Sequence, residues 1–556
     1  MIHSRHLMCY APLALLLAPL GQAQAQQPLS DSLRSRVDAV FARWDHTNTP
    51  GCALGISQNG RSVYERGYGM SDLQHGLAVV PQSIFHVASI SKQFAAFSVA
   101  LLAQDGKLSL DDDVRKYVKE IPDYGKPITI RQMIYHTSGL RDQWQLLGLA
   151  GWRFPEDLIT EDDVLGIIRR QQGVNFAPGA EWVYSNTGYT LLAVIVKRVS
   201  GQSLREFAQQ RIFAPLGMTH THFHDDHSMI VAGRTSAYEP RDGGGWRISI
   251  PVFDTYGATS LFTTAGDLLK WMQNLDAPTV GSAALVADAQ TSAVLNNGTP
   301  TGYGYGMTLG TYRGLRAVGH GGADAGYRAQ VERYPERSIA VVVLCNASNA
   351  GPNVLLRRTA DVLLGSSAPP VVAAIDTVPR QVGAESRARW VGTYRDTVSQ
   401  QVVRVRLKDD TLVMNDGRRL TITSDSTARV AGAASAFVLR GAGAAPSALV
   451  QVPRSTRDLI FRRETHITAT KALLAQYAAS YYSEELDARY VLVAADSTLN
   501  VQHRKIRGME LSPAFADAFT TNLGATVLFM RDKARRVSGF TLTDGRVRGV
   551  RFVRER

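Results

Sequence analysis

The segment Phe85-His86-Val87-Ala88-Ser89-Ile90-Ser91-Lys92 runs directly into an apolar stretch, Phe94 to Leu102, that predicts a helix. A spacing of three residues puts the hydroxyl of Ser89 and the amine of Lys92 on one face of such a helix, at its first turn. A partly desolvated lysine can take the proton of a serine hydroxyl, which is a poor nucleophile without such a base. The pair alone is weak evidence, because serine and lysine are common, but two further segments fit the same chemistry.

The second segment is Glu181-Trp182-Val183-Tyr184-Ser185-Asn186-Thr187-Gly188-Tyr189, which opens a predicted helix through Leu191–Val199. Tyr184 and Asn186 lie two residues apart in non-helical backbone and can project into the same cleft. A lysine ammonium beside the phenol would favour the phenolate, so that Tyr184 could shuttle a proton. The amide of Asn186 can hydrogen-bond a substrate and Lys92 together.

The third segment, Gly319-His320-Gly321-Gly322-Ala323, precedes a predicted strand over residues 329–334. Glycines allow a substrate backbone to lie along a sheet edge. The backbone N–H groups of Ala323 and Ser89 can then form an oxyanion hole.

Taken in this order, Ser89-Ile90-Ser91-Lys92, Tyr184-Ser185-Asn186 and His320-Gly321-Gly322 resemble the motifs of the active-site serine β-lactamase and penicillin-binding-protein superfamily. The resemblance is closest to its class C, D,D-carboxypeptidase, D-aminopeptidase and esterase branch, and it covers about residues 30–365. It implies an α/β (α+β) hydrolase domain in which helices pack on an antiparallel sheet.

The resemblance also implies roles for individual residues. Ser89 would be the acylated nucleophile, Lys92 and Tyr184 the proton-transfer pair, and Asn186 a ligand of substrate and lysine. The third motif (His320, Gly321, Gly322 and Ala323) would form the strand wall of the site. β-Lactamases usually carry lysine where this chain has His320, and a histidine near pH 7 is mostly neutral. This departure favours a peptidase, amidase or esterase over efficient penicillin hydrolysis.

The N-terminal residues 1–25 read as a secretory signal peptide, with an apolar run from Ala11 to Leu20 and the small-x-small site Ala23-Gln24-Ala25. We therefore expect an exported protein, periplasmic or secreted. The apolar run is too short for a membrane-spanning anchor, and no later segment predicts one, so the mature chain should contain no transmembrane segment.

Residues 366–385 lack periodicity and predict a linker, after which the pattern changes to short alternating strands. This part repeats itself at an offset of 87 residues, which lays Trp390 on Tyr477 and Tyr394 on Tyr481. We expect two small antiparallel, lipocalin-like β-barrels, over 386–467 and 468–556, with these aromatic pairs in their cores. In similar architectures a barrel loop reaches over the catalytic cleft, which is a hypothesis for this chain.

The net charge of +12 comes entirely from the C-terminal part, because residues 380–556 carry 29 Lys+Arg and 17 Asp+Glu while residues 1–379 carry 32 of each. The asymmetry serves solubility, or it attracts the barrels to an anionic cell envelope. Nucleic acid is not an expected partner, since no binding motif is present. The expected partner is a small-molecule or peptide substrate.

Cys52 and Cys345 lie in apolar strand-like segments, and two buried free thiols are favoured over a disulfide. The His/Asp run from His220 to His227 could bind a metal, but a solvated strand and polar turn is favoured. No metal and no organic cofactor is expected.

The sequence thus predicts an exported serine hydrolase that cleaves an amide or ester through an acyl-enzyme on Ser89. Its substrate would be a D-amino-acid peptide, a peptidoglycan-like stem or a small ester. Two alternatives remain open: a penicillin-binding sensor that stops at the acyl-enzyme, and a carrier whose barrels bind a small ligand.

Overall fold

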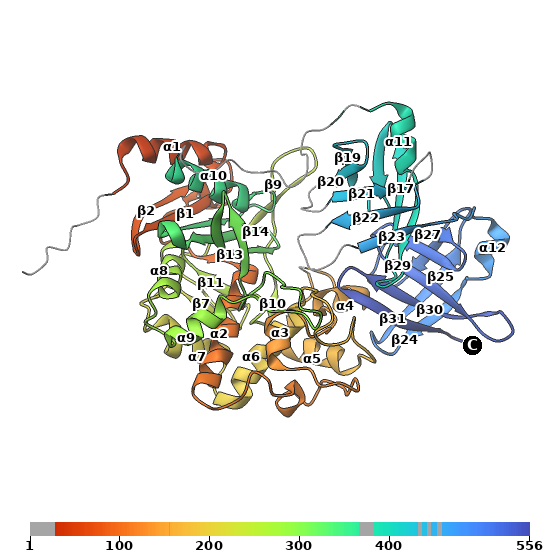
Figure 1. Cartoon of the computed structure of the whole chain (residues 1–556), viewed down its shortest axis with the longest axis horizontal. Helices are drawn as coiled ribbons and strands as arrows, with labels where there is room; N and C mark the ends of the chain where they lie inside the picture. The colour runs from red at the N-terminus through yellow and green to blue at the C-terminus, as the bar shows by residue number, and fades with distance from the viewer. Residues whose placement is uncertain are drawn as a thin grey trace, which may run out of the picture.

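The computed structural model describes residues 28–154, 156–365, 380, 382–431, 436–441, 446–452 and 459–556. A mixed helix–sheet domain is followed by two closed antiparallel barrels (Figure 1). The predicted signal peptide (1–25) and most of the predicted linker (366–379 and 381) lie outside the described residues. None of the helices in the described ranges combines the length and apolar character that a membrane span needs.

The sheet of the first domain is antiparallel, as predicted, and it joins strands from both ends of the domain. Its order is β12-β13-β14-β15-β1-β2. The strands are β1 (Cys52–Gln58), β2 (Arg61–Tyr68), β12 (Thr308–Tyr312), β13 (Leu315–Asp324), β14 (Tyr327–Tyr334) and β15 (Ile339–Cys345). Asn59 and Gly60 both have positive φ between β1 and β2, which is the tight hairpin turn that this dipeptide predicts.

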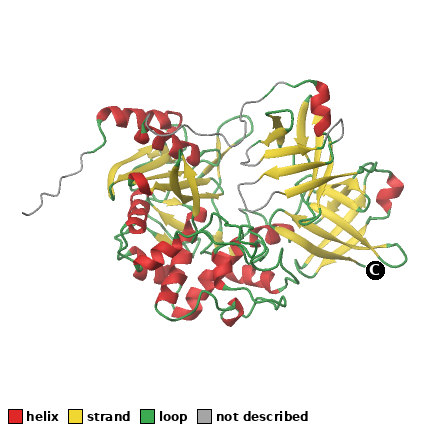
Figure 2. Ribbon diagram, viewed as in Figure 1, coloured by secondary structure: helices red, strands yellow, loops and turns green. Residues whose placement is uncertain are grey.

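Helices cover both faces of this sheet (Figure 2). Cys52, Leu54 and Ile56 of β1 face α1 and α10, and Ala53 and Gly55 face α8, so the strand is buried on both sides. The helices of the domain are α1 (Asp31–Phe41), α2 (Ser91–Gln104), α3 (Ile130–Ile134), α4 (Gln143–Leu149), α5 (Glu161–Arg169), α6 (Asn186–Ser200), α7 (Leu204–Ala208), α8 (Ala265–Asp276), α9 (Ala283–Ala289) and α10 (Pro352–Leu364).

Short strands outside the main sheet form small two- and three-stranded sheets in the same domain. They are β3 (Met70–Asp72), β4 (Leu77–Ala78), β5 (Phe85–His86), β6 (Ile159–Thr160), β7 (His222–Phe223), β8 (Tyr238–Pro240), β9 (Trp246–Ile248), β10 (Phe253–Asp254) and β11 (Leu261–Thr263).

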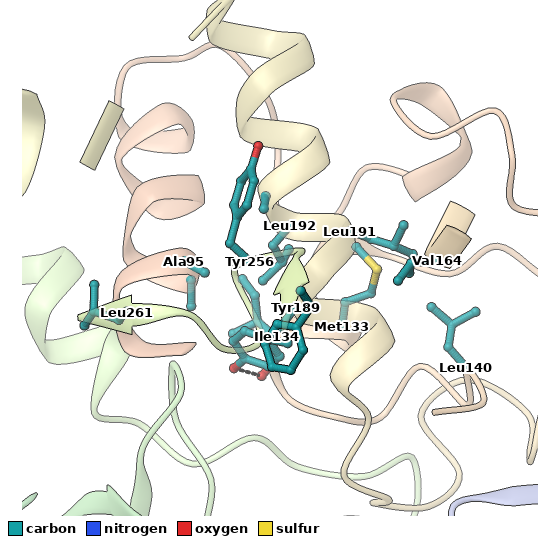
Figure 3. Packing of buried hydrophobic residues seen from close by; sticks show 14 of the residues in the cluster. Ala95, Met133, Ile134, Leu140, Val164, Tyr189, Leu191, Leu192, Tyr256 and Leu261 are labelled. Atoms are coloured by element: carbon teal, nitrogen blue, oxygen red, sulfur yellow. Dashed lines mark hydrogen bonds between the residues drawn. The ribbon is translucent and has the colours of Figure 1, made fainter. Parts of the chain in front are cut away.

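Helix α2 is the centre of this part, since every residue from Ser91 to Leu102 is buried. It packs against α6, and Figure 3 shows the shared core around Ala95, Leu191 and Leu192. A helix that is apolar on all sides must be enclosed, so any polar group that it carries is drawn into the core with it.

The cysteine prediction was wrong. Cys52 and Cys345 form a disulfide, with Cα atoms 4.1 Å apart and 293 residues between them in sequence. They are directly paired in the register of β1 and β15. The sequence showed two apolar strand segments, but it could not show that these were neighbours in the sheet.

Both barrels close with eight strands each, which confirms the predicted repeat. Tyr394 donates to the carbonyl of Trp390, and Tyr481 donates to the carbonyl of Tyr477, so the aligned aromatic pairs make the same buried contact. The first barrel comprises β16 (Gly392–Asp396), β17 (Val402–Lys408), β18 (Thr411–Met414), β19 (Arg419–Ile422), β20 (Thr427–Val430), β21 (Ala436–Arg440), β22 (Ala448–Val452) and β23 (Leu459–Glu464), preceded by α11 (Ala384–Trp390).

The second barrel comprises β24 (Ala479–Ser483), β25 (Ala488–Ala494), β26 (Leu499–Gln502), β27 (Glu510–Phe515), β28 (Ala518–Thr521), β29 (Thr526–Arg531), β30 (Val537–Asp544) and β31 (Val547–Arg554), preceded by α12 (Lys471–Ala475). It docks on the first domain beside α4 and α5 (Figure 1). Its core is continuous with that of the helices, whereas the first barrel has a core of its own. A buried ion pair, Arg141 with Glu485, crosses the contact.

The disulfide gives a first prediction. Replacing both Cys52 and Cys345 by serine should lower the free energy of unfolding of the first domain by about 2–4 kcal/mol, because the bond restricts a long loop in the unfolded chain. Denaturant unfolding with and without dithiothreitol measures this. The reductant should lower the stability of the wild type and leave the double variant unchanged. Identical curves for the wild type in both conditions would contradict the bond.

Candidate active site

A pocket of about 1070 Å³ opens where the N-terminal end of α2, the start of α6, strand β13 and the second barrel meet. Its lining includes the predicted residues Ser89, Tyr184, Asn186, His320, Gly321, Gly322 and Ala323. The amine of Lys92 lies beneath the pocket floor, in contact with Ser89. All eight predicted site residues therefore meet in one place.

The backbone around Ser89 turns sharply into α2. Ala88 has a φ of +47°, and Ser89 lies in a short 3₁₀ turn (Ala88–Ile90) directly before the helix. The neighbouring Ser91 hydroxyl donates to the carbonyl of Ala88 and accepts from the backbone N–H of Leu261. Ser91 is thus used to anchor the turn, while the Ser89 side chain faces the pocket.

Lys92 has no exposed surface. Its Nζ lies 3.1 Å from Ser89 Oγ, 2.8 Å from Asn186 Oδ1 and 2.6 Å from the carbonyl oxygen of Ala258. Burial lowers the pKa of this amine well below its usual value, with Asp142 opposing the shift. A neutral amine has two N–H groups and one lone pair. Because the amide and carbonyl oxygens can only accept, they take the two N–H groups, and the lone pair is left for the Ser89 hydroxyl.

Asp142 fixes the orientation of Asn186. Its Oδ2 accepts hydrogen bonds from both the backbone N and the side-chain Nδ2 of Asn186, each at 2.8 Å, which turns Oδ1 toward Lys92. Sequence reasoning missed Asp142, since it is also the N-cap of α4 and looks like an ordinary capping residue.

Tyr184 lies against the lysine, with Lys92 Nζ 4.8 Å from the centre of its ring. Burial raises the pKa of the phenol, although the nearby Ser89 hydroxyl and Arg546 oppose this. Burial therefore outweighs the expected stabilisation of a phenolate. The hydroxyl is enclosed and has no hydrogen-bond partner in the described part of the chain, so it keeps a proton that it can donate to a bound ligand.

The surroundings of His320 favour its neutral form. Its Nδ1 lies 2.6 Å from the carbonyl oxygen of Gly321, which can only accept, so this nitrogen carries the hydrogen. Its Nε2 then accepts from the Tyr303 hydroxyl at 3.0 Å. Burial, and after it the nearby amine of Lys92, lowers the pKa of His320 to about 4. This histidine cannot supply the permanent cation that a lysine would.

Two glycines of the third segment, Gly319 and Gly322, serve packing. A Cβ at Gly322 would lie 2.1 Å from the carbonyl oxygen of Val87, and one at Gly319 would lie 1.9 Å from that of Val331. Strand β13 thus packs directly against the backbone that leads into Ser89. The glycine at position 322 is needed for this contact, and not to make room for substrate as expected. Ala323, the next residue, is exposed in the pocket.

A residue of the second barrel completes the lining. Arg546, in the hairpin between β30 and β31, places its guanidinium 4.8 Å from the ring centre of Tyr184 and 3.7 Å from Asp142 Oδ2. The barrel loop expected at the cleft is thus the β30–β31 hairpin, and Arg546 is its residue in the pocket lining. Sequence reasoning could not select it among the many arginines of this basic region.

The His/Asp run lies outside this pocket. Within the described ranges, Asp226, His227 and Asp254 bring possible metal-ligating atoms within 4.8 Å of one another at the surface. The backbone N and Nδ1 of His227 bond Asp254, which accounts for the grouping without an ion.

The profile of the beta-lactamase family matches residues 37–366, more than half of the chain. The chain belongs to the beta-lactamase family.

Two curated relatives are D-aminopeptidases. That of Brucella canis is 27% identical over 346 residues, which is 62% of this chain and 63% of the relative. That of Cereibacter sphaeroides is 27% identical over 454 residues, which is 80% of this chain and 82% of the relative. The chain thus matches a little less than two thirds of the Brucella enzyme.

Two solved structures share the fold. The octameric penicillin-binding protein homologue of Pyrococcus abyssi gives a TM-score of 0.55 at 22% identity, over 78% of this chain and 99% of that one. The D-amino acid amidase of Ochrobactrum anthropi SV3 gives 0.51 at 22% identity, over 60% of this chain and 99% of that one.

The buried amine gives a second prediction. Because burial lowers the pKa of Lys92, the neutral, base-competent form should predominate well below the ordinary lysine pKa of ~10.4. Activity should fall only as the pH drops through this lowered pKa, so kcat/KM for an uncharged substrate should reach its plateau well before pH 10. His320→Gln should leave the acid limb in place, since His320 is already neutral above about pH 4. A rate that still climbs at pH 10 would contradict a neutral lysine.

Proposed function

We propose that this chain hydrolyses an amide or ester bond through an acyl-enzyme on Ser89. The observation that carries the proposal is the contact of 3.1 Å between the Ser89 hydroxyl and a fully buried lysine amine. The remaining bonds of that amine are taken by Asn186 and Ala258, so its lone pair is directed to the serine.

The residues support a complete cycle. Lys92 takes the proton of Ser89 as Oγ attacks the substrate carbonyl, and the backbone N–H groups of Ser89 and Ala323 stabilise the oxyanion. Tyr184 donates its proton to the leaving amine or alkoxide and regains one from Lys92. Water then attacks the acyl ester, gives its proton back through the same pair, and frees the acid and the Ser89 hydroxyl.

We propose D-amino-acid peptides and amides, peptidoglycan-like stems or small esters as the substrates. The D-aminopeptidase relatives support the first of these classes. The pocket is wide enough for a short peptide, and Trp144, Phe154 and Phe253 form an apolar side wall for a hydrophobic side chain.

We propose further that the protein works outside the cytoplasm, in the periplasm or beyond it. The predicted signal peptide supports this, and so does the Cys52–Cys345 disulfide, since such bonds persist in oxidising compartments. The positive charge of residues 380–556 supports an attraction of the barrels to the anionic cell envelope.

A substrate panel tests the proposal. Ser89→Ala should lose at least ~100-fold in kcat/KM on every true substrate, because only binding and the oxyanion hole remain. D-amino-acid p-nitroanilides and p-nitrophenyl esters make suitable substrates. Ser98→Ala is a matched control on the same helix, since its hydroxyl bonds the carbonyl of Phe94 and does not line the pocket. Equal rates for Ser89→Ala and wild type would place the chemistry elsewhere, and a single burst without turnover would favour the sensor.

A further inference from the structure

Three arginines line the pocket that contains Ser89: Arg247, Arg328 and Arg546. Two of them are engaged with the protein. Arg247 pairs with Glu239 at 2.5 Å, and Arg328 donates to the carbonyl oxygens of Ala325 and Tyr327 at 2.8 and 2.7 Å.

Arg546 is different. Its guanidinium donates no hydrogen bond to any residue that the structure describes, and its nearest acidic partner, Asp142 Oδ2, is 3.7 Å away. That carboxylate oxygen already accepts two hydrogen bonds from Asn186. Arg546 is 45% exposed toward the pocket. It is therefore a cation with unused donors inside the site.

The backbone around Arg546 is held on both sides. Its N–H donates to Gln145 Oε1 at 2.6 Å, and its carbonyl oxygen accepts from Asn175 Nδ2 at 2.7 Å. Two residues further on, Arg548 donates from its backbone to Asn175 and forms a two-point ion pair with Glu181. The hairpin of the second barrel is thus fastened to the rim of the pocket.

The guanidinium itself lies over the ring of Tyr184, at 4.8 Å from its centre. Tyr184 also contacts Lys92 on its ring, so Arg546 and the catalytic amine flank the same side chain. Both the loop and the stacked side chain are preorganised before a ligand arrives, which reduces the entropy lost on binding.

We propose that Arg546 binds a carboxylate of the substrate close to the bond that Ser89 attacks, so that the second barrel sets the substrate preference. This inference rests on the proposed function and extends it. A guanidinium can bind a carboxylate through two parallel N–H···O bonds. His320 also lines the pocket but adds no positive charge near pH 7, because burial lowers its pKa to about 4.

Two matched substrate pairs test the inference. D-Phe-Gly and D-Phe-glycinamide differ only in a carboxylate on the leaving-group side. The p-nitroanilides of D-glutamate and D-glutamine differ only in a carboxylate on the acyl side. The wild type should favour the carboxylate member of at least one pair by ~10-fold or more in kcat/KM, the size of a charge-assisted hydrogen bond.

In that pair, Arg546→Gln should bring the ratio close to unity, and Arg546→Lys should keep part of it because it keeps the charge without the fork. Arg535→Gln is the matched control: it removes the same charge from an exposed position of the same barrel that does not line this pocket. Circular dichroism and thermal unfolding check that the variants are folded.

An unchanged ratio in Arg546→Gln would overturn the inference, as would an equal drop in Arg535→Gln or a wild type that shows no preference in either pair. These outcomes leave the proposed function intact. If Ser89→Ala turned the compounds over as fast as the wild type, the proposed function would fail and the inference with it.

Discussion

The burial of one amine, that of Lys92, is the constraint on which the site depends. Helix α2 is apolar on all sides and carries this amine into the core, where an unpaired polar group would be costly. Three groups meet it: the Ser89 hydroxyl from the same turn, and the Asn186 amide oxygen and the Ala258 carbonyl oxygen from distant segments. The start of α6 and the loop before β11 supply the two distant groups, and burial also lowers the pKa of the amine, which favours its neutral, basic form.

The second barrel belongs to the same arrangement, whereas the first barrel does not. The core of the second barrel is continuous with the helical core, and Glu485 pairs with Arg141 in the buried contact between them. Arg141 is followed by Asp142, which orients Asn186 and faces Arg546. The segment Arg141-Asp142 therefore connects the domain contact to Asn186, the partner of Lys92. A shift of the second barrel would change the geometry of the site. The first barrel has a separate core and meets the second through contacts such as Val402 with Thr526.

Local patterns explain what the sequence predicted. The helix beginning near Ser89 follows from residues close together in sequence, and the two barrels follow from the repeat of Trp390/Tyr394 in Tyr477/Tyr481. Three ordered motifs and the family resemblance then indicated which local features meet. The predictions that were wrong or missing concern contacts between residues far apart in sequence.

Cys52 and Cys345 became neighbours only through strand order, and periodicity does not encode that order. Asp142 has the appearance of a helix cap and Arg546 that of one more surface arginine, because their contacts with the site come from tertiary packing and domain docking. Gly319 and Gly322 lie in the predicted strand wall, but they were expected to admit the substrate backbone. Their lack of a Cβ instead admits the protein's own backbone.

The most direct measurement is the identification of the residue that an active-site acylating or phosphonylating reagent modifies. A fluorophosphonate should add once per chain, and peptide mass spectrometry should place the adduct on Ser89 and not on Ser91, whose hydroxyl is occupied by Ala88 and Leu261. Lys92→Met keeps the length and burial of the side chain but removes the base, and it should slow labelling by ~100-fold or more. An adduct on another residue, or labelling of Lys92→Met at the wild-type rate, would contradict a serine activated by a buried amine.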